Sequence, residues 1–360
     1  MKTPFGKRRR DLLNQLASGK LHALLISRPA NWYYLTGFTG DSGALLATKF
    51  GTALVTDGRF TGQARQETSG VRIVPQSGGL LNSAGAWLAG QRVRRVGFDP
   101  QQITVAQLRA LRKATGSRVT WIPTAGLPEA LRMRKDPSEL AQMRRAALLA
   151  SEVVAGAAKL LKPGVREFEI AAEIEYQMRR RGASGQAFET IVASGWRTAL
   201  PHARPTAKRL GKNELVVLDL GAILAHYCSD ITRTFYLGRA PARIRGWYRA
   251  VQEAQIAAIA AVRSGAGCGE VDAAARQVLA GYRLDRFFVH STGHGLGLEV
   301  HEDPRIAKGQ SWRLEPGNVV TIEPGVYVEG VGGIRIEDDV AVHVDRTEVL
   351  TRFTRDLIEI

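Results

Sequence analysis

The sequence predicts an α+β protein of two domains, and three observations support this. Short apolar strands alternate with amphipathic helices over residues 1–125, which is typical of an α/β domain. A stretch with several Pro and Gly residues, 126–137, then interrupts the pattern and predicts an irregular linker. Within 138–360, two helices followed by strands occur twice. A chain of 360 residues is long enough to form two hydrophobic cores.

The elements expected in the first domain follow from hydrophobic periodicity and turn residues. An amphipathic pattern predicts the first helix, and alternating or continuous apolar runs predict strands. The aromatic segment Asn31–Phe38 is typical of a core or an interface rather than of catalysis. We expect helices at 8–20, 57–67, 80–89 and 104–114, and strands at 23–27, 44–48, 52–56, 71–74, 93–98 and 119–122.

The second domain is expected to be an internal duplication. Ser138 and Glu139 predict the start of a long helix that ends before Pro163-Gly164. A second helix at 167–181 and strands near 188–193 and 215–237 complete the first half. Helices at 243–262 and 270–281, followed by strands from 287 onward, repeat this order. We expect the two α+β halves to share one curved sheet.

The composition is that of a soluble globular protein. Hydrophobic residues make up 44% of the chain and charged residues 23%. No apolar run approaches the roughly 18 residues of a membrane helix, and the N-terminus lacks the features of a secretory signal. Cys228 and Cys268 are too few for a disulfide framework. We therefore expect a cytoplasmic protein without a membrane partner.

The net charge of +16 is unevenly distributed along the chain. Residues 1–137 contain 21 Lys and Arg against 7 Asp and Glu, whereas residues 138–360 contain 29 against 27. Such a basic segment either attracts polyanions or forms a solvated, Arg-rich surface. Apart from Lys7–Arg10 the basic residues are scattered, without interleaved Gly and aromatic residues. The sequence thus favours the solvated surface and disfavours nucleic acid as a partner.

Two aspartates in strand-like surroundings are the first sign of a metal site. Asp219 follows the apolar run Val216–Leu218, and Asp230 begins a β-prone segment after the turn-like residues 225–227. In a hairpin the two carboxylates can face each other, where they repel unless a cation lies between them. The alternative is an Asp219 in a turn and an Asp230 paired with Arg233.

The second half adds histidines and glutamates. His290, His294 and His301 lie within twelve residues, although the chain has only 7 histidines. Glu323 ends the apolar strand 319–322, and alternation predicts that Arg335 and Glu337 share one face of a strand. A glutamate inside such a strand requires a partner.

Together these residues form an oxygen-rich set with little nitrogen and no sulfur. Four carboxylates and a histidine in a Gly-rich segment suit Mn²⁺, Co²⁺ or Zn²⁺ in a two-metal site. Bridging carboxylates hold such ions about 3.5–4 Å apart in aminopeptidases and phosphatases. The candidate ligands are Asp219, Asp230, His294, Glu323 and Glu337.

These motifs resemble the M24 family of pita-bread metallopeptidases. DLGAILAHYCSDITRTF, STGHGLGLEVHE, TIEPGVY and GIRIEDD, with PHARP around His202, are similar to the family's proline-specific branch of Xaa-Pro aminopeptidases and prolidases. NWYYLTGF and TDGRF resemble the creatinase-type N-terminal domain. The resemblance implies a creatinase-like domain over 1–125, a linker over 126–137 and a pita-bread catalytic domain over 138–360.

The resemblance also implies a role for each site residue. Asp219 would chelate one metal, His294 and Glu323 the other, and Asp230 and Glu337 would bridge both. His202 and His301 would be catalytic and, with His290, would contact the substrate; Arg305 would reach a substrate carboxylate. Arg335 would orient a ligand carboxylate, and Glu323 would also shuttle a proton.

The implied function is hydrolysis of the Xaa-Pro bond at the N-terminus of peptides. The implied cofactors are two divalent metal ions, of which we expect Mn²⁺ before Co²⁺ or Zn²⁺, and the implied assembly is a homodimer. The sequence leaves two activities open, an aminopeptidase that accepts longer peptides and a prolidase restricted to dipeptides. A metal-free module that binds polyanions is the alternative from another class, and the complete ligand set argues against it.

Overall fold

The structure is a computed structural model that describes residues 4–360. The chain forms two compact units, of which one ends at Arg132 and the next begins at Met133. Each unit is described by itself. Over residues 4–360, none of the helices combines the length and the apolar character that crossing a bilayer requires.

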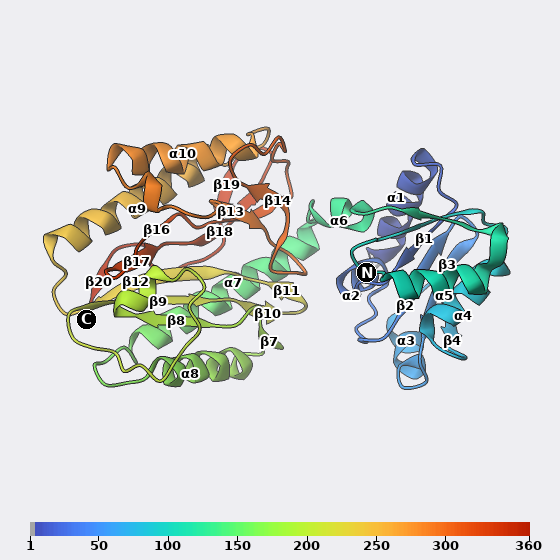
Figure 1. Cartoon of the computed structure of the whole chain (residues 1–360), viewed down its shortest axis with the longest axis horizontal. Coiled ribbons are helices and arrows are strands. Elements are labelled where there is room, and N and C mark those ends of the chain that lie inside the picture. The colour runs from blue at the N-terminus through green and yellow to red at the C-terminus, as the bar shows by residue number, and fades with distance from the viewer. Residues whose placement is uncertain (1–3) are drawn as a thin grey trace. The chain divides into compact units, whose positions relative to one another are not determined.

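The first unit is organised around a six-stranded sheet with the strand order β4-β3-β2-β1-β5-β6 (Figure 1). β1 pairs antiparallel with β2 and parallel with β5, so the sheet is mixed. Buried side chains such as Leu25, Leu46 and Val96 form its core with Leu88 and Leu111 of the covering helices. The elements are α1 (Phe5–Ser18), β1 (Ala23–Ile26), α2 (Pro29–Thr36), β2 (Ala44–Thr48), β3 (Gly51–Thr56), α3 (Thr61–Glu67), β4 (Arg72–Pro75), α4 (Leu80–Ala89), β5 (Arg95–Phe98), α5 (Val105–Thr115), β6 (Thr120–Pro123) and α6 (Leu127–Arg132).

Two segments of this unit differ from the sequence prediction. The aromatic segment contains a helix, α2, which begins at Pro29 and ends before Gly37 in a left-handed conformation (φ 81°). The stretch 126–137, expected to be irregular, contains α6. Pro128 is the second residue of α6, where a missing N–H costs nothing. The prediction was wrong because Pro and Gly also mark helix ends.

The second unit contains four long helices and several small sheets. Asp136, rather than Ser138, caps α7: its side chain accepts hydrogen bonds from the backbone N–H groups of Ser138 and Glu139. The elements are α7 (Pro137–Ala158), α8 (Glu167–Arg180), β7 (Gly185–Gln186), β8 (Ile191–Ser194), β9 (Glu214–Leu220), β10 (Ala222–Leu224), β11 (Tyr227–Cys228), β12 (Ile231–Leu237), α9 (Ala242–Ala261), α10 (Cys268–Gly281), β13 (Gly293–Gly295), β14 (Glu302–Ile306), β15 (Val319–Ile322), β16 (Gly325–Val328), β17 (Gly332–Arg335), β18 (Asp338–Val342), β19 (Thr347–Val349) and β20 (Ile358–Glu359).

The two halves of this unit each have an apolar core. One core joins α7 and α8 to β9 and β12, and the other joins α9 and α10 to β15–β18. The hydrogen-bonded strands form separate sheets, chiefly β20-β12-β9-β8 and β14-β13-β15-β18-β19, rather than the single sheet we expected. Local bonds such as Glu337 N–H to the carbonyl of Thr232 (3.2 Å) join the two sheets instead.

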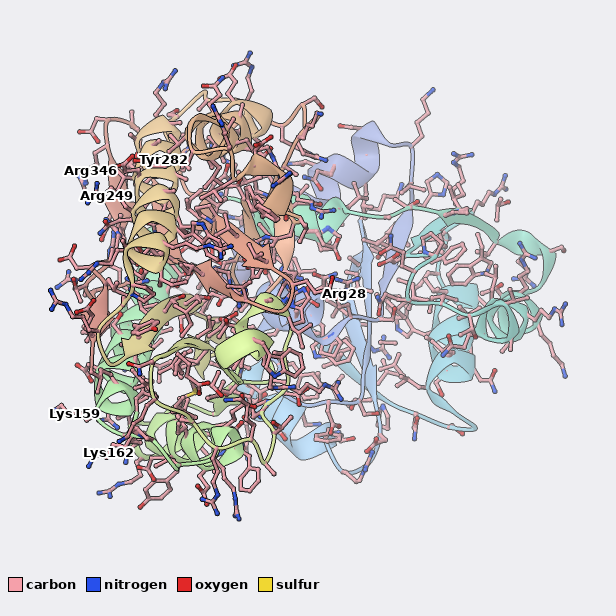
Figure 2. The ribbon with its side chains drawn as sticks, turned by 60° about the vertical axis from the view of Figure 1, so that its left-hand side comes forward. Arg28, Lys159, Lys162, Arg249, Tyr282 and Arg346 are labelled. Atoms are coloured by element: carbon pink, nitrogen blue, oxygen red, sulfur yellow. The ribbon has the colours of Figure 1, made fainter. Side chains whose placement is uncertain are left out.

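The helices cover the outside of the strands. In Figure 1, α9 and α10 lie side by side on one side of the strands, and α8 lies on the opposite side. On the outer surface of the α9/α10 pair, the Tyr282 hydroxyl, just after α10, donates to Glu253 of α9 at 2.7 Å. Tyr282 and Arg249 lie close together on this surface in Figure 2. Because helices cover the strands on both sides, an enclosed site can form at the strand ends between the two helical layers.

An ion pair connects the first and the last parts of the second unit. Arg144 of α7 donates two hydrogen bonds of 2.7 Å to the two carboxylate oxygens of Glu348 in β19. His343 Nε2 lies 2.8 Å from the same carboxylate. The hydrogen bonds from Arg144 hold the pKa of Glu348 at about 2, below its usual value.

We predict that Glu348→Gln lowers the free energy of unfolding at pH 7 by about 1 kcal/mol, since the pair is partly exposed to solvent. Because the folded pKa is depressed, this contribution is present above the unfolded pKa of about 4.3 and is lost as the pH falls toward 2. Urea unfolding of both proteins between pH 7 and 3 checks this. Arg144→Gln is the matched control, and a constant difference over this range would contradict the assignment.

Candidate metal centre

The five side chains singled out as metal ligands converge at the strand ends of the second unit. Asp219 lies in β9 and His294 in β13. Asp230 directly precedes β12, Glu323 directly follows β15, and Glu337 directly precedes β18. Each half of the unit thus contributes carboxylates, and His294 comes from the second half.

The distances within this group are those of a shared binding site. His294 Nε2 lies 3.5 Å from Glu323 Oε1 and 3.9 Å from Asp230 Oδ2. One ligand atom each from Asp230, His294 and Glu337 lie within 4.8 Å of one another. Three elements distant in sequence therefore present donor atoms to one small volume.

The local backbone explains this convergence, and its strand pairing differs from the one that we expected for Asp219 and Asp230. Asp219 pairs with Thr232 across β9 and β12, so Asp230 lies diagonal to Asp219 rather than opposite it. The turn between β10 and β11 is made by Ala225 and His226, both with positive φ (49° and 71°). The strand expected to run through Glu337 is interrupted, because β17 ends at Arg335.

Close packing of β13 against β15 places the histidine. A Cβ atom on Gly293 would lie 1.8 Å from the carbonyl oxygen of Thr321, so only glycine fits there. The neighbouring His294 N–H then donates to Thr321 Oγ1 at 3.1 Å. The glycine-rich segment thus serves strand contact rather than flexibility.

The electrostatics of the group require a positive charge. Burial, followed by repulsion from neighbouring carboxylates, raises the pKa of Asp230 and Glu323, and raises that of Glu337 to about 8. Asp219 Oδ1 and Asp230 Oδ1 are buried, and across residues 4–360 neither has a hydrogen-bond partner. Buried carboxylate oxygens without donors are costly, and a divalent cation supplies what they lack.

His294 is oriented to act as a ligand. Its Nδ1 donates to the carbonyl of Gly295 at 3.0 Å, which leaves the lone pair of Nε2 directed toward the carboxylates. Burial lowers the pKa of His294 to about 4, so the ring is neutral near pH 7. An oxygen-rich set with one neutral imidazole fits Mn²⁺, Co²⁺ or Zn²⁺.

A second layer of hydrogen bonds holds the ligand carboxylates. Arg335 donates to Asp219 Oδ2 at 2.5 Å and to Thr232 Oγ1 at 3.1 Å, and Thr232 in turn donates to Glu337 Oε2 at 2.6 Å. Arg335 also donates to the Tyr327 hydroxyl at 2.7 Å. One buried guanidinium therefore orients a carboxylate from each half of the unit.

A second buried arginine stabilises the backbone next to Glu337 through hydrogen bonds. Arg233 of β12 donates to Asp338 Oδ1 at 2.8 Å and to the carbonyls of Phe353 and Thr354 at 2.7 Å each. It also donates to the carbonyl of Glu337 at 2.5 Å. Arg233 is therefore paired with Asp338, and not with Asp230 as the alternative interpretation required.

The remaining residues implicated by sequence surround the cluster. The His301 ring lies 4.4 Å from that of His294, centroid to centroid. The Nε2 of His290 lies 2.8 Å from the Tyr327 hydroxyl. Burial lowers the pKa of His290 and His301, and the nearby His202 lowers both further. Burial also lowers the pKa of His294, to which the nearby Arg305 contributes. All of them therefore lie near the candidate ligands.

Sequence reasoning missed two contributors. Tyr327, buried in β16, contacts both His290 and Arg335, and burial raises its pKa to about 12, so its hydroxyl stays protonated. Thr232 connects Arg335 to Glu337. The spacing Asp230-x-Thr232 places both residues on one face of a strand, and this signal could have identified the threonine.

The sequence of the chain matches a known class of peptidase. The sequence pattern of Metallopeptidase family M24 matches residues 141–343, and that of the Creatinase/Prolidase N-terminal domain matches residues 8–134. The chain therefore belongs to metallopeptidase family M24, with a creatinase-type N-terminal domain and a pita-bread catalytic domain, as the motifs predicted.

Similar sequences and solved structures agree with this assignment. The chain is 36% identical to the uncharacterised peptidase YqhT of Bacillus subtilis over 349 residues, 97% of this chain and 98% of the relative. It is similar to the Xaa-Pro dipeptidase from Bacillus anthracis (TM-score 0.96, 34% identity, 99% and 100% covered). It is also similar to the X-Pro aminopeptidase from Thermotoga maritima (TM-score 0.89, 33% identity, 98% and 100% covered).

We predict that the carboxylate cluster makes the second unit more stable when a divalent metal is added. A ligand at 100 times its Kd stabilises the folded state by about 2.7 kcal/mol, which corresponds to roughly 5–10 °C in Tm for a unit of this size. Differential scanning fluorimetry of chelator-treated protein, with and without Mn²⁺, measures this. Asp230→Asn should lose most of the shift, whereas Glu348→Gln should retain it; an equal shift in Asp230→Asn would contradict the site.

Proposed function

We propose that this protein is a metal-dependent exopeptidase that hydrolyses the Xaa-Pro bond at the N-terminus of peptides. The observation that supports it most is the buried cluster of four carboxylates and His294, which matches the ligand set of a two-metal hydrolase. The similarity to proteins named Xaa-Pro dipeptidase and X-Pro aminopeptidase over nearly the whole chain indicates the substrate class.

The proposed metal ligands divide between two ions. Asp219 would hold one ion, His294 and Glu323 the other, and Asp230 and Glu337 would contribute to both. Divalent ions, which we expect to be Mn²⁺, would supply a water of lowered pKa and positive charge opposite the reacting carbonyl oxygen. The pairing of Arg335 with Asp219 Oδ2 leaves the buried Oδ1 of that carboxylate available for an ion.

The chain's own residues would move the proton and stabilise charge. Burial and neighbouring carboxylates raise the pKa of Glu323, so this side chain can accept a proton and deliver it to the leaving imino nitrogen of proline. His202 and His301, both exposed toward solvent, would donate hydrogen bonds to the carbonyl oxygen as it gains negative charge. Hydrogen bonds to the Ser291 carbonyl and the Tyr327 hydroxyl orient the ring of His290, which would contact the substrate.

A specificity for dipeptides is the second candidate, and the position of Arg305 favours it. Arg305 is exposed in β14 and lies near enough to His294 to influence its pKa. A guanidinium at this position could bind the free carboxylate of a dipeptide, which a longer peptide carries farther away. The family resemblance further leads us to propose a homodimer in the cytoplasm.

The deciding assay compares Ala-Pro with Ala-Pro-Ala in the presence of Mn²⁺, with Asp230→Asn as the inactive control. Release of alanine from the tripeptide identifies an aminopeptidase, and cleavage of Ala-Pro alone identifies a prolidase. We expect Asp230→Asn to lower kcat/KM at least 100-fold on either substrate, because a bridging ligand is lost. Absence of turnover on both peptides with Mn²⁺, Co²⁺ and Zn²⁺ would refute the proposed substrate class.

For a prolidase, we predict that Arg305→Gln raises the KM for Ala-Pro about 10–100-fold with little change in kcat, since a charge-assisted hydrogen bond contributes about 1.5–3 kcal/mol. The exposed Arg313, which donates to the carbonyl of Gly265 away from the cluster, provides the control variant Arg313→Gln. Steady-state kinetics of both variants test the role, and an equal effect of the two substitutions would remove it.

A further inference from the structure

Two buried carboxylates outside the metal cluster each anchor a segment that bears one of the outer histidines. The first is Glu167, the initial residue of α8, whose side chain is 0% exposed. Its Oε1 accepts the N–H of Ser194 at 2.9 Å and the hydroxyl of Ser194 at 2.8 Å. Its Oε2 accepts the N–H of Thr206 at 3.0 Å and the hydroxyl of Thr206 at 2.7 Å. A single carboxylate thus joins both ends of the segment 194–206.

The middle of this segment is also tied to Glu167. Arg197 Nε lies 3.1 Å from Glu167 Oε2, and another nitrogen of Arg197 donates to the carbonyl of Arg204 at 2.6 Å. His202 lies in the segment, and its side chain is exposed. The position of the His202 ring therefore depends on a backbone loop whose two ends and centre all depend on one carboxylate.

The second carboxylate is Asp272 of α10, whose side chain is 1% exposed. Its Oδ1 accepts the N–H and the hydroxyl of Thr292, at 3.2 and 2.8 Å, and its Oδ2 accepts Nε of Arg276 at 2.7 Å. Arg276 also donates to the carbonyls of Phe288 (3.2 Å) and His290 (2.6 Å). The segment 288–292, which carries His290, is thus fixed by an acid–arginine pair on one helix.

The two arrangements have the same composition but come from non-equivalent positions. In each, one carboxylate oxygen accepts both the N–H and the hydroxyl of a Ser or Thr, and an Arg Nε completes the set. Glu169 and Glu270 occupy the third position of α8 and α10, where each accepts the N–H of the residue that precedes its helix (2.8 and 3.0 Å), and this aligns the helices. Glu167 is then the first residue and Asp272 the fifth. Duplication of one half would place the two carboxylates at equivalent helix positions, which they do not occupy. Their recurrence therefore indicates a shared physical requirement.

We propose that Glu167 and Asp272 are positioning residues that set the places of His202 and His290 relative to the metal cluster. The inference rests on the proposed function of the two histidines. A carboxylate that accepts several N–H and O–H donors fixes them more firmly than a neutral group does, because charge-assisted hydrogen bonds are shorter and stronger. Misplacement of a catalytic group by about 1 Å can lower a rate 100-fold.

The test uses Glu167→Gln and Asp272→Asn in the full-length, Mn²⁺-loaded protein. Both substitutions keep the side-chain shape and remove the charge. Glu348→Gln is the control, because Glu348 is likewise a carboxylate paired with an arginine, although a more exposed one, and is unconnected to either segment. We expect kcat/KM on Xaa-Pro peptides to fall about 10–100-fold in the two variants, and to stay within about twofold in the control.

A second readout does not depend on peptidase activity. The rate at which diethyl pyrocarbonate modifies each histidine, measured by mass spectrometry, reports the exposure and surroundings of its ring. We expect the rate for His202, whose ring is already exposed, to change at least threefold in Glu167→Gln, and His290, which is partly buried, to react at least threefold faster in Asp272→Asn, with the other histidine unchanged in each. These labelling changes in a protein without Xaa-Pro activity would support the positioning role while the proposed function fails.

Unchanged labelling and kinetics relative to Glu348→Gln would overturn the proposal. If Glu167→Gln does not fold, Thr206→Val removes a single donor to Glu167 and leaves the backbone N–H in place. This variant should still change the labelling rate of His202 without altering the Mn²⁺-induced rise in Tm, because the candidate metal ligands lie on other elements. A loss of the Mn²⁺ response with unaltered labelling would likewise contradict a role confined to the histidine segment.

Discussion

The mutual repulsion of buried carboxylates is the constraint on which the second unit depends. Asp219, Asp230, Glu323 and Glu337 lie close together, and burial followed by repulsion from neighbouring carboxylates raises the pKa of Asp230, Glu323 and Glu337. Such a group is stable only if cations or protons compensate its charge. Arg335 supplies one positive charge, at Asp219, and the unpartnered oxygens require more. A divalent cation at this candidate site would relieve the repulsion that makes the cluster unfavourable without one.

The surrounding strands and helices shield these carboxylates from solvent and fix their positions relative to one another. Each half of the unit packs two helices over its strands, and the carboxylates lie where the two sets of strand ends meet. Gly293 allows β13 to approach β15 closely, and Thr232 and Arg335 transmit the orientation of one ligand to another. Packing, hydrogen bonding and charge therefore converge on the same small volume.

The sequence predicted the parts of this protein in which local pattern and chemistry coincide. The long helices of the second unit, the hairpin β2–β3 and the strand before Glu323 follow from periodicity and turn residues. The candidate ligand set could be picked out from the sequence because acids in apolar strands are unusual. Helices α2 and α6 were missed because Pro29 and Pro128 mark helix starts as readily as breaks. The diagonal relation of Asp219 and Asp230 was missed because register depends on pairing that no single strand encodes.

The hydrogen bonds of Arg233 in β12 affect the order in which parts of the protein can fold during synthesis. The guanidinium bonds to the carbonyls of Phe353 and Thr354, which lie about 120 residues later in the chain. During synthesis at roughly 5–20 residues per second, Arg233 waits several seconds for these acceptors to leave the ribosome. The first half of the catalytic unit can fold earlier, but the strand beside its candidate metal ligands gains this support only after residues 353 and 354 have been synthesised.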